Sequence, residues 1–279
     1  MIPANFNYLR PATLDEAIAA LGSNEDAKVL SGGHSLIPAM KLRLAQPKLV
    51  VDISRVADLA YIREAGTHVA IGAMTTHHDI ESSALLKEKC PLMCEVAAVI
   101  GDVQVRNRGT LAGSLVHADP AADWPAAILA LDAEMEIAGP NGRRTVKSGK
   151  FFVDMMQTAV QPGELLVEIR VPFTGHPAAY VKTAQKASGF AIAGVAVVAD
   201  NVTKTVRVGL TGVAAKPSRA KHVERYLKGK DLTADTIAKA ATRASKDVDA
   251  LNDIHASAEF RLHLACVNAK RALALAGSR

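Results

Sequence analysis

Hydrophobic residues near the start of the chain follow a helical spacing once and otherwise form short unbroken runs. A capping box of Thr13 and Glu16 begins a predicted helix that ends at Gly22, and its hydrophobic residues share one face: Leu14, Ala17, Ile18 and Leu21. Three short hydrophobic runs predict strands over residues 28–30, 48–53 and 69–71. Further helices are predicted from Thr76 and over residues 90–100, where Pro91 lies in the first turn.

The middle of the chain contains one long stretch with little periodicity, residues 101–123. We expect it to be irregular, and a segment of this length inside a compact domain is usually functional. After it the pattern predicts a helix over residues 124–131, a hairpin of residues 134–138 and 144–147, and a strand over residues 164–171.

The pattern changes after Phe173-Thr-Gly-His-Pro177, which we interpret as a domain boundary. An antiparallel meander is predicted over residues 180–186, 192–198 and 206–210. Alanine-rich helices follow at about 218–228, 234–248 and 257–276, and in the last of them Phe260, Leu264 and Val267 share one face. The predicted fold class is α+β, with one domain at 1–175 and a smaller one at 176–279.

Composition narrows the class of protein. The chain of 279 residues is 49% hydrophobic and can bury a core, whereas an aromatic share of 4% argues against binding bases by stacking. The net charge is +5, and basic residues are densest between Lys216 and Lys230, which is either a solvated face or a docking surface for an acidic partner. The longest apolar run, Ala191 to Ala199, is about half a membrane span. With no signal-peptide pattern at the start, we expect a soluble cytoplasmic protein.

Metal and redox motifs are weak. Cys90 and Cys94 are too far apart for a C-x-x-C pair, and with Cys266 they cannot supply the usual four ligands of an iron–sulfur cluster, so we expect core cysteines. His77 and His78 are adjacent and point about 100° apart on a helix, so a solvated helix start is favoured over a metal site.

The first candidate segment is Ser31-Gly-Gly-His-Ser-Leu36, where a predicted strand meets two glycines. Glycines allow the backbone to come close to a ligand, and successive N–H groups can converge on an anion. The segment is therefore either a pyrophosphate cradle or an ordinary strand-to-helix turn. The spacings of a Rossmann or P-loop nucleotide site are absent.

The second candidate segment, Thr110-Leu-Ala-Gly-Ser114, has the same character, so the two could hold a diphosphate from both sides. Asp119 and Asp123 follow it. Asp123 could hydrogen-bond a ligand or cap the helix that begins at Trp124. Lys182 and Lys186 are predicted to share one strand face, where a cation could neutralise an anionic ring or phosphate or simply face solvent.

Residues 29–36 and 100–123 resemble the two FAD motifs of the flavoprotein subunit of molybdenum hydroxylases. This family includes the medium subunit of carbon monoxide dehydrogenase, bacterial aldehyde and glyceraldehyde oxidoreductases, and relatives of xanthine dehydrogenase. The resemblance extends to Lys182 and the run 188–196. It implies a two-subdomain FAD-binding domain of the vanillyl-alcohol-oxidase (PCMH) type, followed by a C-terminal domain of the carbon monoxide dehydrogenase flavoprotein type.

The resemblance also implies roles for particular residues. The FAD pyrophosphate would be held by backbone amides of Val29, Leu30, Ser31, Gly32, Gly33, His34, Ser35 and Leu36, and from the other side by Thr110, Gly113 and Ser114. The remaining positions would lie near the flavin ring or its nucleotide: Ile100, Gly101, Val105, His117, Asp123, Leu165, Leu166, Lys182 and Phe190. Two departures are small: Ala112 replaces a common Gly, and Ser114 replaces a common Asn, which weakens one contact.

The implied function is that of an FAD-binding electron-transfer subunit. A molybdopterin-type molybdenum cofactor would lie in a large partner subunit and two [2Fe–2S] clusters in a small one, in a dimer of heterotrimers without nucleic acid. Two alternatives remain at this point: a stand-alone FAD-dependent oxidase or dehydrogenase, and a scaffold that has lost FAD. The short C-terminal domain without acid/base pairs favours electron transfer, and the glycines argue against the scaffold. The sequence names neither the substrate nor the final electron acceptor.

Overall fold

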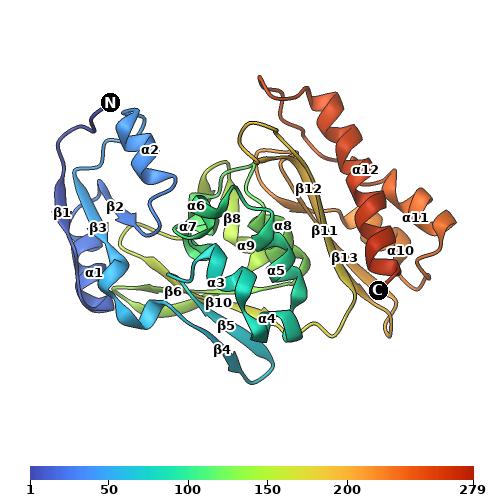
Figure 1. The fold of residues 1–279 in the computed structure, drawn as a ribbon, viewed down its shortest axis with the longest axis horizontal. Helices are drawn as coiled ribbons and strands as arrows, with labels where there is room; N and C mark the ends of the chain where they lie inside the picture. Colours follow the sequence, from blue (N-terminus) through green and yellow to red (C-terminus); the bar gives the residue numbers. More distant parts are fainter.

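The computed structural model describes all 279 residues. Its three larger sheets are arranged one after another along the long axis of the molecule (Figure 1). The first is a small parallel sheet in the order β1-β3-β2. Its strands are β1 (Asn7–Leu9), β2 (Ala27–Leu30) and β3 (Leu49–Asp52), and its helices are α1 (Leu14–Gly22) and α2 (Leu36–Lys41). The predicted capping box at the start of α1 is present. Two 3-10 turns, Ile53–Arg55 and Ala57–Leu59, lead to the next sheet.

The central sheet is antiparallel, in the order β4-β5-β10-β6-β7. Its strands are β4 (Ile62–Ala65), β5 (His68–Gly72), β6 (Glu134–Gly139), β7 (Gly142–Lys147) and β10 (Leu165–Pro172). Helices cover it: α3 (His77–Ser82), α4 (Ala84–Lys89), α5 (Pro91–Ala98), α6 (Val103–Arg106), α7 (Leu111–His117), α8 (Trp124–Ala130) and α9 (Ser148–Phe151). A two-stranded ribbon of β8 (Phe152–Asp154) and β9 (Gln157–Thr158) lies beside them.

The third sheet is the predicted meander with one short strand added. It contains β11 (Ala178–Ala184), β12 (Ala191–Asp200), β13 (Thr205–Thr211) and β14 (Ser218–Arg219). Three helices cover its outer face: α10 (Lys221–Leu227), α11 (Ala234–Ala241) and α12 (Ala258–Gly277). The expected α+β class with a terminal meander and helices is confirmed.

Strand β12 is buried on both faces, which explains why the run from Ala191 to Ala199 has no polar residue. Ala196 and Val198 belong to the same hydrophobic core as α5 and α8, whereas Val195 and Val197 pack with α12 in a second core. Alternate side chains of a strand point to opposite faces, so a sheet between two helical layers is apolar at every position.

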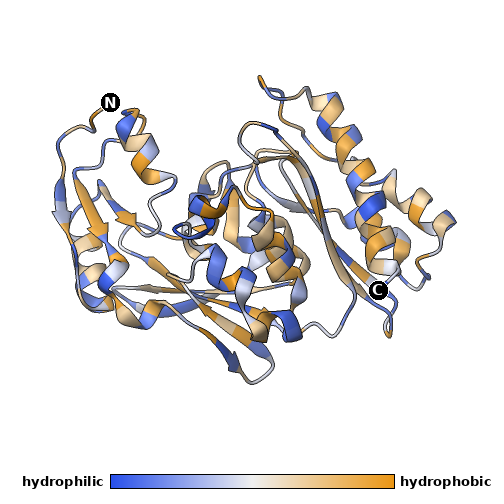
Figure 2. Ribbon diagram, in the orientation of Figure 1, coloured by the Kyte–Doolittle hydropathy of each residue, from blue (hydrophilic) through white to orange (hydrophobic).

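Two expectations were wrong. Residues 101–123 are not wholly irregular, because Asp102 caps α6 and Thr110 caps α7 through side-chain oxygens. The buried face of α12 is also different: Phe260 is exposed, and Arg261 and Asn268 face the sheet with their polar groups bonded to backbone carbonyls. Figure 2 shows the resulting alternation of hydrophobic and hydrophilic residues along α12.

Candidate functional site

The two glycine segments lie against each other in the structure. The Oγ of Ser31 and the Oγ1 of Thr110 are 2.8 Å apart, although 79 positions separate them in the sequence. A Cβ atom on Gly32 would overlap the carbonyl oxygen of Arg108, so only glycine allows the two backbones to come this close. The structure therefore brings together the two segments that the sequence singled out.

The first segment has backbone donors without protein partners. None of the peptide N–H groups from Ser31 to Leu36 donates to a protein acceptor, whereas the next one, on Ile37, donates to the Gly33 carbonyl at 3.1 Å. Gly33 has a left-handed φ of 78°, and the side chains of His34 and Ser35 are exposed. Val29 and Leu30, at the end of β2, are half-buried. A run of unpaired amides beside a glycine turn is the donor set that binds anionic groups, so these residues fit the diphosphate of FAD.

In the second segment most amides donate to protein acceptors. Thr110 Oγ1 accepts the N–H of Gly113 at 3.1 Å, and the N–H of Leu111 donates to the Thr75 carbonyl at 3.1 Å. Ser114 and His117 are half-buried on α7. The start of α7 therefore holds the second segment in a fixed position.

His77 bonds to the residue that precedes the second segment and so helps to hold the segment in place. It is buried, its Nδ1 accepts the indole N–H of Trp124 at 3.1 Å, and its peptide N–H donates to the Gly109 carbonyl at 2.9 Å. Burial lowers the pKa of His77 to about 4, so the ring is neutral at physiological pH. The prediction of a solvated helix start is wrong for His77 but holds for His78, which is exposed. The 100° between adjacent helical residues, which argued against a shared metal, also allows one ring to point inward.

A buried ion pair joins the C-terminal sheet to the central helices. Lys182 Nζ donates to the carbonyls of Val99 at 2.6 Å and Gly189 at 2.7 Å, and it lies 3.0 Å from Asp123 Oδ1. Tyr180 Oη donates to the same Asp123 oxygen at 2.6 Å. The side chains of Lys182 and Asp123 are only 9% and 5% exposed. We call Asp123, Tyr180 and Lys182 the junction cluster.

Burial dominates the electrostatics of the junction cluster. It raises the pKa of Asp123, against the opposing effect of the Lys182 ammonium, and it raises the pKa of Tyr180 well above its usual value. Asp123 makes no helix-capping bond, so that alternative is wrong: its oxygens are engaged by Tyr180 and Lys182. Lys186 lies beyond the end of β11, which stops at Ala184, and therefore does not share a strand face with Lys182.

Several predicted ring-side residues surround the junction cluster. Gly101 has φ 49° and Gly189 has φ 74°, and a Cβ atom on Gly189 would lie 3.6 Å from the Gly101 Cα. Ile100 and Val105 are half-buried beside them, and Phe190 is 50% exposed. Leu165 and Leu166 lie on β10, where both are buried in the hydrophobic core.

The structure contains no group of three His, Cys, Asp or Glu side chains that could hold a metal ion. All three cysteines are free: Cys90 and Cys94 are buried, as expected for core cysteines, and Cys266 is half-buried. Burial raises the pKa of the Cys90 thiol to about 11. None of the helices combines the length and the hydrophobicity that a membrane-spanning helix requires.

Comparisons with known proteins agree over the full chain. Residues 4–174 match the family described as "FAD binding domain in molybdopterin dehydrogenase", and residues 178–276 match "CO dehydrogenase flavoprotein C-terminal domain". The carbon monoxide dehydrogenase medium chain of Hydrogenophaga pseudoflava is 41% identical, covering 100% of this chain and 99% of its own. The glyceraldehyde dehydrogenase medium chain of Sulfolobus acidocaldarius is 37% identical, covering 94% of each chain.

Solved structures show the same similarity. Carbon monoxide dehydrogenase from Hydrogenophaga pseudoflava, in a form that lacks the Mo-pyranopterin moiety of its cofactor, matches with a TM-score of 0.96 at 42% identity, covering 100% of this chain and 99% of the other. Quinoline 2-oxidoreductase from Pseudomonas putida 86 matches with a TM-score of 0.95 at 31% identity over the same shares. The chain therefore belongs to the FAD-binding medium subunits of the molybdenum hydroxylase family, and it is a flavoprotein subunit of an oxidoreductase complex.

Proposed function

We propose that this chain is the electron-transfer subunit of a cytoplasmic molybdenum hydroxylase. It would take electrons from two [2Fe–2S] clusters of a small partner subunit and pass them to an external acceptor, while a large partner subunit carries the molybdenum cofactor. The observation that carries the proposal is the run of unpaired amides from Ser31 to Leu36 beside the second glycine segment. FAD, when bound, supplies a carrier that accepts and releases electrons.

The first domain, residues 1–175, would bind the diphosphate of FAD between the two glycine segments. The amides of residues 31–36 would donate to its oxygens, with Val29 and Leu30 leading the backbone into the turn. Thr110, Gly113 and Ser114 would close the other side, where the start of α7 also presents its positive end. The chain contributes mainly backbone donors here, which do not change charge with pH.

The flavin ring would lie beside the segment that joins α5 to α6. Ile100 and Gly101 belong to this segment and Val105 to α6 itself. Phe190 would approach from the second domain, residues 176–279. Lys182 holds this arrangement, because its ammonium bonds carbonyls on both sides, those of Val99 and Gly189. His117, Leu165 and Leu166 would support the ring or nucleotide from α7 and β10.

The purified chain alone tests the proposal against a stand-alone flavoenzyme. It should bind FAD and pass electrons from chemically reduced flavin to an artificial acceptor, but oxidise no aldehyde, purine or carbon monoxide. Adding the companion molybdenum and iron–sulfur chains should restore flavin reduction by substrate. Substrate turnover by the isolated chain, at the rate of the reconstituted complex, would establish the stand-alone enzyme instead.

A further inference from the structure

Basic residues concentrate on the outer side of the C-terminal domain. Residues 216–246 contain nine lysines and arginines and three acidic residues, whereas the whole chain has a net charge of only +5. The stretch forms α10, α11 and the turns around them, on the face of the third sheet that points away from the central domain (Figure 1). The positive charge of the protein is therefore located on one surface, remote from the glycine segments.

All three acidic residues of this stretch are already paired. Glu224 binds Arg219 at 2.5 Å, Asp231 binds Lys204 at 2.9 Å and Asp235 binds Lys239 at 2.8 Å. Seven cations of this stretch have no carboxylate within 4.0 Å. One of them, Lys216, donates to the Val153 carbonyl. We call the other six the α10–α11 basic surface: Lys221, Arg225, Lys228, Lys230, Arg243 and Lys246. None of these six cations forms an ion pair within the chain.

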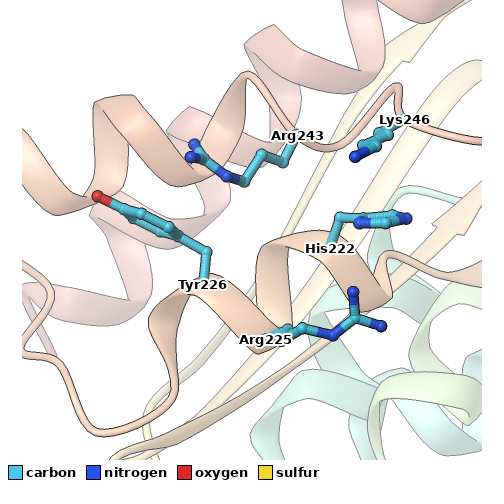
Figure 3. A pocket seen from close by; sticks show the side chains of 5 residues that line it. All are labelled: His222, Arg225, Tyr226, Arg243 and Lys246. Carbon is cyan, nitrogen blue, oxygen red and sulfur yellow. The ribbon is translucent and has the colours of Figure 1, made fainter.

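A hollow of about 250 Å³ lies within this surface (Figure 3). Arg225 and His222 reach it from α10, and Arg243 and Lys246 reach it from the segment after α11. The hollow is smaller than the 300–1,000 Å³ typical of small-molecule sites. The six cations also extend beyond the hollow, and a single small anion could not neutralise all of them. An extended anionic surface fits better.

The residue types on this surface indicate which extended anionic partner fits it: a nucleic acid, a membrane or an acidic protein. Its one aromatic residue, Tyr226, has Lys230 Nζ at 3.6 Å and Arg243 Cζ at 4.0 Å from the ring centroid, so its ring is occupied and cannot stack on a base. None of the exposed large hydrophobic side chains lies between residues 216 and 246, so nothing there would insert into a membrane. With neither base stacking nor apolar insertion available, an acidic protein surface is the partner that this surface favours.

We propose that the α10–α11 basic surface docks an acidic segment of a companion chain in the same complex. The inference rests on the proposed function, which supplies the companion chains. Charge pairs of this kind chiefly raise the association rate and fix orientation, and salt weakens them. The surface would thus select and orient a partner without touching the FAD site.

Carbodiimide cross-linking of the intact complex tests the contact directly, because it joins a lysine amine only to a carboxylate in contact with it. Mass spectrometry should find Lys230 or Lys246 joined to Asp or Glu of a companion chain. Cross-links from these lysines confined to this chain would overturn the proposal.

Charge reversal gives the matching binding test. The Arg225→Glu/Lys246→Glu variant should bind the companion chains about tenfold more weakly at low salt, and the difference should shrink at about 0.5 M salt. The control Lys147→Glu/Lys150→Glu makes the same change in charge at exposed residues of the central domain and should bind normally.

The other outcomes of that test contradict the proposal. Equal affinity of the two variants would do so, as would wild-type binding to phosphatidylserine vesicles that the Arg225→Glu/Lys246→Glu variant loses while its companion binding stays intact. Full displacement of the companions by inorganic phosphate at constant ionic strength would indicate a small-anion site instead. FAD content, measured on every sample, separates these results from failure of the proposed function, since only the latter predicts a colourless chain.

Discussion

The first glycine segment and the junction cluster use hydrogen-bond donors in opposite ways. From Ser31 to Leu36 no peptide N–H has a protein acceptor, whereas the Lys182 ammonium is bonded to two carbonyls and a carboxylate. Unpaired donors at a half-buried loop are available to a ligand, and a fully bonded buried cation is not. The first segment is therefore free to bind an anionic ligand, whereas the junction cluster joins the C-terminal sheet to the central helices.

The largest expected effect is at the junction. Lys182→Met would leave the buried Asp123 carboxylate with Tyr180 alone, and breaking one side of a buried ion pair costs about 3–5 kcal/mol of the free energy of unfolding. Denaturant unfolding of the FAD-loaded chain measures it, with Lys186→Met, at an exposed residue, as the control. Unchanged stability together with a lower flavin reduction potential would contradict the structural role of Lys182, because Lys182 would then act on the flavin itself.

The second effect is a loss of folding stability at low pH. His77 has a pKa of about 4 in the folded protein and about 6.5 when unfolded, so the unfolded chain binds a proton first as pH falls. The ring costs no stability above pH 6.5, and about 3 kcal/mol should be lost between pH 6.5 and 4. Subtracting the stability curve of His77→Asn, which keeps an acceptor for Trp124, should isolate this loss. Parallel curves for the two proteins would show that the His77 ring does not titrate differently in the folded and unfolded chains, and so is not buried in its neutral form.

Disturbing the contact between the two glycine segments should reduce the free energy of unfolding by a smaller amount. Gly32→Ala places a methyl group against the Arg108 carbonyl, and such overpacking costs about 1–3 kcal/mol. Because the segments must separate, bound FAD should also be lost, which flavin absorbance per chain measures. Gly149→Ala, where nothing lies within 4 Å, is the control. A Gly32→Ala protein that stays fully yellow would show that the cradle is elsewhere.

The smallest effect is expected at Thr110. Thr110→Val keeps the shape but removes both the cap on Gly113 and the contact with Ser31, so about 1 kcal/mol of stability should be lost. Thermal unfolding with and without FAD gives the change, and Thr145→Val on the exposed strand β7 is the matched control. A loss no larger than that of the control would mean that α7 braces the segment without its cap.

The sequence predicted those parts of the fold that have strong local signals. The capping box of α1 and the long apolar run of β12 are examples, and both are observed. Helix α6 has four residues and β1 has three exposed ones, too few for a period to be recognised. Asp102 and Thr110 did carry cap signals within the stretch expected to be irregular.

For the site, the sequence identified both glycine segments but not what holds them. Lys182 meets Val99 and Asp123 at separations of 83 and 59 residues, and no local pattern encodes such contacts. The buried state of His77 was missed for the same reason, since its partner Trp124 lies 47 residues away.

The position of strand β12 between two cores affects how the chain can fold during synthesis and where it can be truncated. Since Ala178, Ala196 and Val198 complete the core of the preceding domain, a nascent chain that has emerged only to residue 175 still lacks part of its own interior. Cutting the chain near residue 175 would therefore expose apolar surface on both parts, on the helices α5 and α8 and on the strand β12 that packs against them. Redesign by domain exchange must therefore carry the third sheet along with the helices α5 and α8 that it covers.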